Sequence, residues 1–318
     1  MNQLISRAYD GASDLNLLIE FARKAAKARW PRSTYKNVGD VVWGMPAIGF
    51  DASANFRLWF YGVDFVAYAR FEPPMNLDFD IMPGVAMYDW VGGQILEWAE
   101  DRRRTLAQPG NERIPKALAM LGYERVSLTM ALDTDEQRLS LLEQRGYTRT
   151  DGCDVLYRRS LEDVISAPKL EPSLRLRHAT DADLQARVDV HRDVWSVWGP
   201  SRATVETYRR LREAPIYDPE LDVVLEDASG RFLAYCIGWL DVANGLGHFE
   251  PVGCRPAFTG RGYARAVIIE AMRRMQKRGM HSALVATAGV NQRARVLYPS
   301  CGFVEVDRSH HYTKGFAE

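Results

Sequence analysis

Short apolar runs alternate with amphipathic segments along the second half of the chain. The run 232–241 has the length of a buried strand, and 264–278 repeats its apolar residues at helical spacing and stops at Gly279. We expect strands at 175–177, 221–226, 232–241, 247–254, 282–287 and 304–314, and helices at 181–197, 203–212, 264–278 and 292–300. This order predicts an α+β domain with a mixed central sheet.

The first half of the chain reads as a second copy of the same unit. The segment RAYDGASDL from Arg7 resembles RHATDADL from Arg177. Each has a basic residue in an extended stretch, an Asp-bearing turn and then an amphipathic helix. Asp10 and Asp181 are the candidate helix starters, because a carboxylate accepts hydrogen bonds from the free amides of a first turn.

The two copies also end alike. DEQRLSLLEQRGY from Asp135 parallels NQRARVLYPSCGF from Asn291. We therefore predict domains at 1–160 and 174–318, each a mixed, mostly antiparallel sheet flanked by helices. The segment 161–173 contains two prolines and no clear period, and we interpret it as the linker.

Composition narrows the choice of partners. The 41 basic and 41 acidic residues give a formal net charge of zero, which disfavours nucleic acid as a partner. The run 232–240 is among the longest apolar ones and is far shorter than the roughly 20 residues of a membrane helix. With no secretory signal at the N-terminus, we expect a cytoplasmic protein without a membrane partner. The four cysteines and six histidines show no metal-ligand spacing, so no metal is expected.

The strongest local signal lies between a predicted strand and a predicted helix, at CRPAFTGRGYARAV from Cys254. Gly260 and Gly262 leave room for a ligand to approach the backbone, and three arginines add positive charge. The following helix offers free amide donors and the positive end of its dipole. A Walker loop is excluded because no Gly-Lys-Ser/Thr follows, and the glycine spacing disfavours a dinucleotide fold.

This segment is similar to motif A of the GNAT acetyltransferase family. The matching residues are Cys254, Arg255, Pro256, Thr259, Gly260, Arg261, Gly262, Tyr263 and Ala264, followed by a second landmark at Asn291, Ala294, Leu297, Tyr298, Gly302 and Phe303. Cys254 stands where the family usually has valine, and Thr259 where it has glutamine or arginine. The resemblance covers roughly 174–316 and implies two tandem GNAT-like domains.

The resemblance also implies acetyl-CoA as the co-substrate. Its binding residues would be Val252, Cys254, Thr259, Gly260, Arg261, Gly262, Tyr263, Ala264 and Asn291. In the first copy the equivalent loop, IMPGVAMYDWVGGQIL from Ile81, lacks both the Gly-x-Gly spacing and basic residues, and Leu142 stands where the second copy has Tyr298. We therefore expect the first copy to be inactive and to bind coenzyme A poorly or not at all.

Acetyl transfer to an amine needs a base for the amine and benefits from an acid for the leaving thiolate. The resemblance implies Tyr298 as the acid, and a phenol with a pKa of about 10 is protonated at neutral pH. For the base, Glu250 ranks first because a carboxylate inside a strand needs a reason to be there. His248 is close behind, since its pKa lies naturally near neutrality.

Residues near the first helices of the second copy are candidates for contact with the acceptor. In HRDVWSVWGPS, Trp195 and Trp198 lie near a Gly-Pro turn, and Asp193 could attract an ammonium group. Packing in the core or between domains is the more common role for such residues.

These observations predict an acetyl-CoA-dependent N-acetyltransferase. The amine of a small-molecule acceptor would attack the thioester directly. The alternatives are a non-catalytic, coenzyme-A-binding regulatory protein and an enzyme that acetylates proteins or peptides. We expect a monomer or a homodimer.

Overall fold

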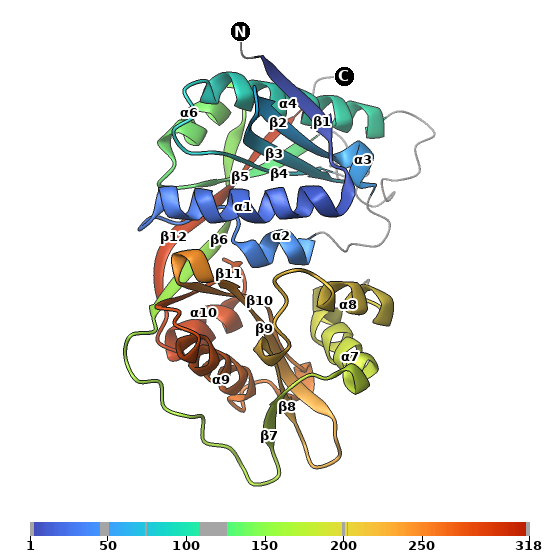
Figure 1. The fold of residues 1–318 in the computed structure, drawn as a ribbon, viewed down its shortest axis with the longest axis vertical. Coiled ribbons are helices and arrows are strands. Elements are labelled where there is room, and N and C mark those ends of the chain that lie inside the picture. The colour runs from blue at the N-terminus through green and yellow to red at the C-terminus, as the bar shows by residue number, and fades with distance from the viewer. Residues whose placement is uncertain are drawn as a thin grey trace.

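The computed structural model describes residues 3–44, 51–73, 75–107, 126–198, 201 and 203–315. In this part of the chain, twelve strands form one continuous sheet in the order β1-β2-β3-β4-β5-β12-β6-β11-β10-β9-β8-β7. The N-terminal half lies at one end of the molecule and the C-terminal half at the other (Figure 1). The pairs β4–β5 and β10–β11 are parallel and the other neighbours are antiparallel, which confirms the predicted mixed, mostly antiparallel architecture.

The N-terminal half supplies six strands and five described helices. The strands are β1 (Leu4–Ala8), β2 (Phe56–Tyr61), β3 (Asp64–Glu72), β4 (Asn76–Ile81), β5 (Val126–Leu132) and β6 (Thr148–Ser160). The helices are α1 (Gly11–Arg29), α2 (Val38–Gly44), α3 (Ala52–Asn55), α4 (Tyr88–Ala107) and α6 (Glu136–Gln144).

The C-terminal half matches the predicted elements to within a few residues. Its strands are β7 (Arg175–His178), β8 (Asp222–Glu226), β9 (Phe232–Asp241), β10 (Leu246–Cys254), β11 (Ser282–Ala288) and β12 (Val304–Gly315). Its helices are α7 (Leu184–Trp195), α8 (Val205–Arg212), α9 (Tyr263–Lys277) and α10 (Gln292–Ser300). The apolar face of α9 is buried against the sheet, as its periodicity predicts.

The two halves interlock through their last strands. β6, the last strand of the N-terminal half, pairs with β11 of the C-terminal half. β12, the last strand of the chain, pairs with both β6 and β5. Figure 1 shows both strands running between the two ends of the molecule. The predicted ranges 1–160 and 174–318 are therefore halves of the chain that share one sheet.

The internal repeat is visible in the way each half begins. The Arg7 guanidinium donates to both carboxylate oxygens of Asp14 at 2.6 Å, and Arg177 does the same to Asp183 at 2.6 and 2.9 Å. Each aspartate also accepts a backbone amide of its turn, and its arginine lowers its pKa. The helix-starting carboxylates are thus Asp14 and Asp183. Neither Asp10, whose side chain forms no cap, nor Asp181 fills this role.

The repeat is equally clear where each half ends. The side chain of Asn291 caps α10 by accepting the Ala294 amide at 3.2 Å, and Asp135 caps α6 by accepting the Arg138 amide at 3.1 Å. Asn291 therefore corresponds to Asp135, and Ala294 corresponds to Arg138. This correspondence confirms the alignment on which the comparison of the halves rests.

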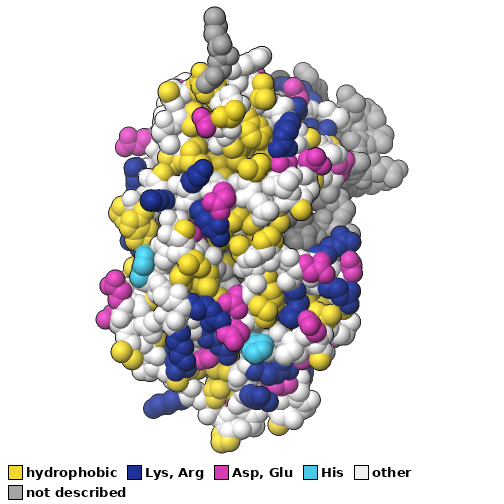
Figure 2. All heavy atoms as spheres, viewed as in Figure 1, with side chains coloured by type: hydrophobic (Ala, Val, Ile, Leu, Met, Phe, Trp, Pro, Cys, Tyr) yellow, Lys and Arg dark blue, Asp and Glu magenta, His cyan; other side chains and the backbone are white. Residues whose placement is uncertain are grey.

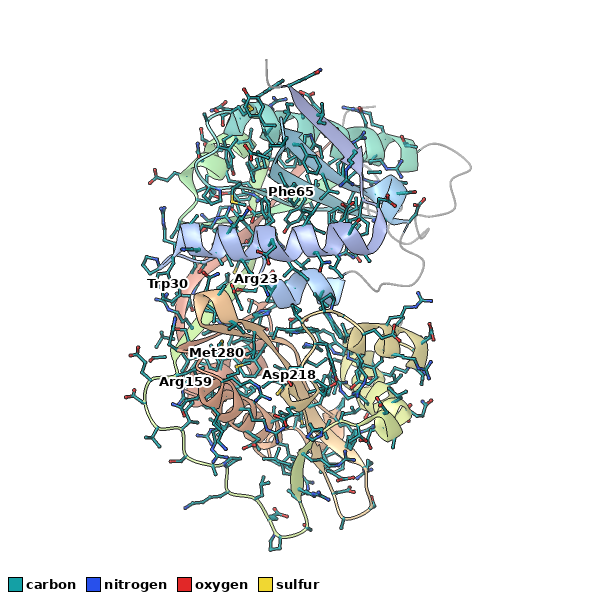
Figure 3. All side chains as sticks on the ribbon, viewed as in Figure 1. Arg23, Trp30, Phe65, Arg159, Asp218 and Met280 are labelled. Atoms are coloured by element: carbon teal, nitrogen blue, oxygen red, sulfur yellow. The ribbon has the colours of Figure 1, made fainter. Side chains whose placement is uncertain are left out.

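Helices α1 and α2 fill the space between the two halves. Their apolar residues share one buried cluster with Ile237 and Trp239 of β9. A Cβ atom at Gly39 would overlap the Trp239 ring, so the glycine allows α2 to lie directly on β9. Arg23 of α1 and Trp30, which directly follows this helix, face the C-terminal half (Figure 3), where the ring of Trp30 contacts the ring of His281. This packing brings the polar residues of α2 beside β10.

The surface carries mixed charge. On the face drawn in Figure 2, basic and acidic side chains are interspersed, in keeping with the zero net charge. Among the described residues, no helix is both long and apolar enough to cross a membrane.

Candidate active site

A cavity of about 1300 Å³ lies between the two halves. Its walls come from the end of α1, from α2, from the strands β6, β10 and β11, from the loop before α9, and from α10. Residues that are far apart in sequence therefore meet in one space.

One end of the cavity is a slot between two strands. β10 and β11 pair in parallel only as far as His248 and Leu284, although both strands continue. A bulge between Phe249 and Val252 interrupts the pairing of β10 with β9 at the same point. The indole of Trp239 donates to the Glu250 carbonyl at 2.6 Å and so satisfies the backbone of the bulge. Beyond His248, one edge of β10 faces the slot instead of a neighbouring strand.

The glycine loop closes the slot at the start of α9. Gly260 and Gly262 have φ angles of +81° and +79°, which side chains other than glycine rarely adopt. The first bond of the helix runs from the Ala266 amide to the Gly262 carbonyl at 3.0 Å. The amides of Tyr263 and Ala264 precede it and have no partner within the helix. This arrangement is a ready-made anion site that opens into the cavity.

The structure brings together every predicted cofactor-binding residue except Arg261. Those that line the cavity are Val252, Cys254, Thr259, Gly260, Gly262, Tyr263, Ala264 and Asn291. Arg261 is exposed outside it, with its guanidinium 5.4 Å from the Phe258 ring. The Thr259 hydroxyl donates to the Pro256 carbonyl, and the Asn291 side chain caps α10, so both have structural roles.

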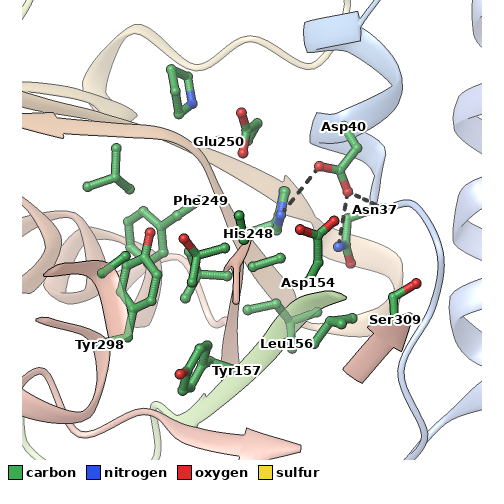
Figure 4. Close-up of a pocket in the computed structure, with 18 of the residues that line it drawn as sticks. Asn37, Asp40, Asp154, Leu156, Tyr157, His248, Phe249, Glu250, Tyr298 and Ser309 are labelled. Atoms are coloured by element: carbon green, nitrogen blue, oxygen red, sulfur yellow. Dashed lines mark hydrogen bonds and ion pairs between the residues drawn. The ribbon is translucent and has the colours of Figure 1, made fainter. Parts of the chain in front are cut away.

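Tyr298 reaches the cavity from α10 and is 6% exposed. Its ring packs against Tyr157 and Phe303, with centroids 5.6 and 6.0 Å away, and Figure 4 shows its hydroxyl directed into the pocket. Burial raises the pKa of this phenol well above its usual value, and the charge of Glu250 adds to the effect. Tyr298 therefore keeps its proton at neutral pH.

Glu250 and His248 lie on the same strand but have different surroundings. Burial, together with the charges of Asp40 and Asp154, raises the pKa of Glu250 to about 8, although the charge of Lys36 partly opposes the shift. No described residue forms a hydrogen bond or an ion pair with this carboxylate. Glu250 is thus free to accept a proton from a molecule in the cavity.

His248 is 4% exposed, and its Nε2 lies 3.6 Å from Oδ1 of Asp40 (Figure 4). Its Nδ1 is sealed from solvent and has no hydrogen-bond partner among the described residues. Burial lowers its pKa, so the ring is neutral near pH 7. With Nδ1 inaccessible and Nε2 turned toward Asp40, His248 is the weaker candidate for the base.

The cavity also contains residues that the sequence did not single out. Asp40 comes from α2, where the Asn37 amide donates to its Oδ2 at 2.8 Å. Asp154 comes from β6. The reasoning applied to Glu250, that a carboxylate inside a strand needs a reason, would have found Asp154. No sequence signal pointed to Asp40, because its place depends on how α2 packs against the other half.

The predicted acceptor contacts are only partly placed in the cavity. Trp195 and its neighbour Val197 line the wall, and the Trp195 indole donates to the Tyr235 hydroxyl at 2.9 Å. Asp193 lies outside this wall, because Arg255 engages its carboxylate at 2.8 Å. The prediction that Asp193 attracts the acceptor is therefore not supported. The side chain of Trp198 lies outside the described part of the chain.

The equivalent slot in the N-terminal half is filled. β4 and β5 pair only at Asn76 and Leu128, so these strands also separate. Arg138 occupies the space at 1% exposure, with its guanidinium 3.6 Å from the Phe79 ring and 4.0 Å from the Tyr35 ring. It also donates to the Phe79 carbonyl at 2.9 Å. The corresponding residue of the other half, Ala294, leaves that slot open.

Residues 188–303 match the model of the acetyltransferase (GNAT) family. This segment therefore resembles a GNAT acetyltransferase domain. A search of curated proteins finds mycothiol acetyltransferases. That of Saccharomonospora viridis is 25% identical over 185 residues, which cover 55% of this chain and 60% of the relative. That of Kineococcus radiotolerans is 32% identical over 114 residues, which cover 36% of each chain. The chain therefore spans less than two thirds of the length of these relatives.

Solved structures match almost the whole chain. A GCN5-related N-acetyltransferase from Sphaerobacter thermophilus has a TM-score of 0.62 at 20% identity and covers 98% of this chain and 95% of its own. A tandem GNAT protein from the clavulanic acid biosynthesis pathway has a TM-score of 0.63 at 12% identity, with coverage of 99% and 100%. These likenesses show that the fold is a tandem GNAT fold. Among the described residues, no group of three or more potential metal ligands converges.

Proposed function

We propose that this protein is an acetyl-CoA-dependent N-acetyltransferase that acetylates the primary amine of a small molecule. The observation that carries the proposal is a single cavity that joins the amides before α9, the slot between β10 and β11, and the side chains of Glu250 and Tyr298. Relatives named mycothiol acetyltransferase support a small-molecule acceptor.

The donor would bind along the slot. The amides at the start of α9 suit the diphosphate of coenzyme A, since helix N-termini favour anions. The edge of β10 that leaves β11 has backbone groups at 252–254 that suit the amides of the pantetheine arm, as an added strand would. The thioester would then lie near Glu250, where the slot opens into the wider cavity.

The transfer itself needs one base and one acid. Glu250 takes a proton from the ammonium form of the acceptor, directly or through water. The amine nitrogen attacks the thioester carbonyl, a C–N bond forms, the C–S bond breaks, and the nitrogen releases its second proton to water as it becomes an amide nitrogen. The departing thiolate takes the proton of Tyr298, whose phenol is kept protonated by burial. Bulk water then restores both side chains to their starting states.

The proposal is tested by release of coenzyme A from acetyl-CoA in the presence of a panel of primary amines and peptides. We expect turnover with at least one small amine, and a loss of about 100-fold or more in kcat for Glu250→Gln. Tight binding of acetyl-CoA without turnover on any acceptor would favour the non-catalytic alternative. Turnover confined to peptides would favour a protein acetyltransferase.

A further inference from the structure

Strand β6 belongs to the N-terminal half but pairs with β11 of the C-terminal half, and it forms one wall of the cavity. Alternate residues of a strand point to opposite faces. Asp154, Leu156 and Arg158 line the cavity, whereas Val155 on the opposite face belongs to the core of the C-terminal half, and Tyr157 both belongs to that core and reaches the cavity wall. The N-terminal half therefore places a carboxylate next to the proposed catalytic residues through its last strand.

Burial raises the pKa of the half-buried Asp154 carboxylate, although electrostatic interactions with His311 and Lys36 partly oppose the shift. Neither of these two residues forms an ion pair with the carboxylate, and no other described residue forms a hydrogen bond or an ion pair with it. In β6 it lies opposite Ala288 of β11 and Ser309 of β12, whose short side chains leave the space around it open. Placing such a group in a cavity is costly unless a positive charge meets it there.

Three carboxylates from different elements line this part of the cavity: Asp40 from α2, Asp154 from β6 and Glu250 from β10 (Figure 4). We call them the acidic corner. The nearby ammonium group of Lys36 is held by Asp78 at 3.1 Å. His248, 4% exposed and lying among the three carboxylates, is neutral and has an unpartnered Nδ1. The charges of Asp40 and Asp154 raise the pKa of Glu250, so a cation bound in the acidic corner would relieve the repulsion among the three carboxylates.

The members of the acidic corner have different partners. Asp40 is already held by Asn37 and faces His248. Glu250 and Asp154 both lack partners among the described residues. Glu250 is assigned to the amine that becomes acetylated, which leaves Asp154 for a different cationic group.

We propose that the acceptor is a small molecule with two amino groups, and that Asp154 binds the ammonium group that is not acetylated. This assignment rests on the proposed function, because it takes Glu250 as the base. Asp154 is then the specificity-determining residue that distinguishes a diamine from a monoamine of the same length. A charge pair in a partly buried site can supply such discrimination, since the wrong acceptor would leave the carboxylate unpaired.

The test compares matched acceptors on the full-length protein. The probes are 1,3-diaminopropane, 1,4-diaminobutane and 1,5-diaminopentane, each paired with the amino alcohol of the same length. We expect at least one diamine to exceed its amino alcohol by about tenfold or more in kcat/KM, mainly through KM. In Asp154→Asn this preference should fall to within about threefold, because the diamine loses its advantage in KM.

Asp151→Asn is the matched control, because Asp151 is exposed on the same strand and lies outside the cavity wall. It should keep the full preference, and acetyl-CoA should bind both variants as it binds the wild type. Equal kcat/KM for diamines and amino alcohols in the wild type, or a preference that survives Asp154→Asn, would overturn the proposal.

Titration calorimetry of the same probes into the protein loaded with coenzyme A separates this inference from the proposed function. Tighter binding of a diamine that is lost in Asp154→Asn supports the acidic corner even if no amine turns over. Turnover of amino alcohols and diamines with equal affinities would support the function and refute the role of Asp154.

Discussion

The two halves of this protein share a framework but differ at one place, the gap between their two parallel strands. In the C-terminal half the gap is lined by Ala294 and leads to Tyr298. In the N-terminal half the same positions hold Arg138 and Leu142, and the arginine lies inside the gap between aromatic rings. Separated strands alone therefore do not make a binding slot. What fills the gap decides whether a ligand can enter.

The halves have also divided their tasks. The C-terminal half presents the anion site, the proposed base and the proposed acid. The N-terminal half contributes Asp40 and Asp154, which face the same cavity from α2 and from β6. A half whose own slot is filled still lines the cavity of the other half, because the two share one sheet.

Filling the open slot with an arginine, as Arg138 fills the gap of the other half, should have the largest effect. Ala294→Arg puts the side chain of Arg138 at the equivalent position of the open slot. We expect acetyl-CoA affinity to fall by about 100-fold or more, because the long side chain would occupy the path of the pantetheine arm. Calorimetric titration measures this, and Ala294→Ser is the small-residue control that should bind normally. Retained affinity in the arginine variant would show that the slot is not the binding path.

Removing the proposed acid should have the next largest effect. Tyr298→Phe keeps the ring that packs against Tyr157 but loses the hydroxyl. We expect kcat to fall by about 100-fold, with acetyl-CoA affinity nearly unchanged, because a general acid acts in the transition state. Tyr157→Phe provides a control on the neighbouring ring and should retain most activity. Full activity of Tyr298→Phe across the pH range would reject the acid role.

Removing the side chain of Arg138 from its gap should destabilise the fold. Arg138→Ala loses a buried hydrogen bond to Phe79 and contacts with two aromatic rings. We expect a loss of about 2–4 kcal/mol in the free energy of unfolding, measured by urea denaturation. Arg145→Ala breaks a more exposed ion pair with Glu97 on the same half and should cost less than about 1 kcal/mol. Equal losses in the two variants would contradict the packing role of Arg138.

The pH dependence should sharpen the assignment of the base. Glu250 must be deprotonated to act, and its pKa is raised to about 8. The value of kcat/KM should therefore rise with pH through about 8 in the wild type. In Asp40→Asn a neighbouring negative charge is lost, so the pKa of Glu250 should fall and the rising limb should move to lower pH. A limb that stays in place would show that Asp40 does not act on the base.

Much of the C-terminal half could be predicted from the sequence, because its signals are local. The apolar run of β9, the glycine loop before α9 and the helix of Tyr298 each carry their own pattern over a few residues. The structure adds the exchange of β6 and β12, which depends on pairing between distant segments. The residues that line the cavity opposite the glycine loop were harder to predict from the sequence for the same reason. Asp40 and Asp154 reach it only through contacts between the halves.

Each chain should bind one molecule of acetyl-CoA, at the amides before α9, and the N-terminal half should bind none. Calorimetric titration with acetyl-CoA tests this expectation most directly, on the wild type and on Gly262→Val. Valine is disfavoured at a φ of +79°, whereas Gly230→Val imposes similar strain at a φ of +83° in a hairpin away from the cavity. We predict one site per chain, lost in Gly262→Val and kept in Gly230→Val. Two sites per chain, or unchanged affinity in Gly262→Val, would contradict the account.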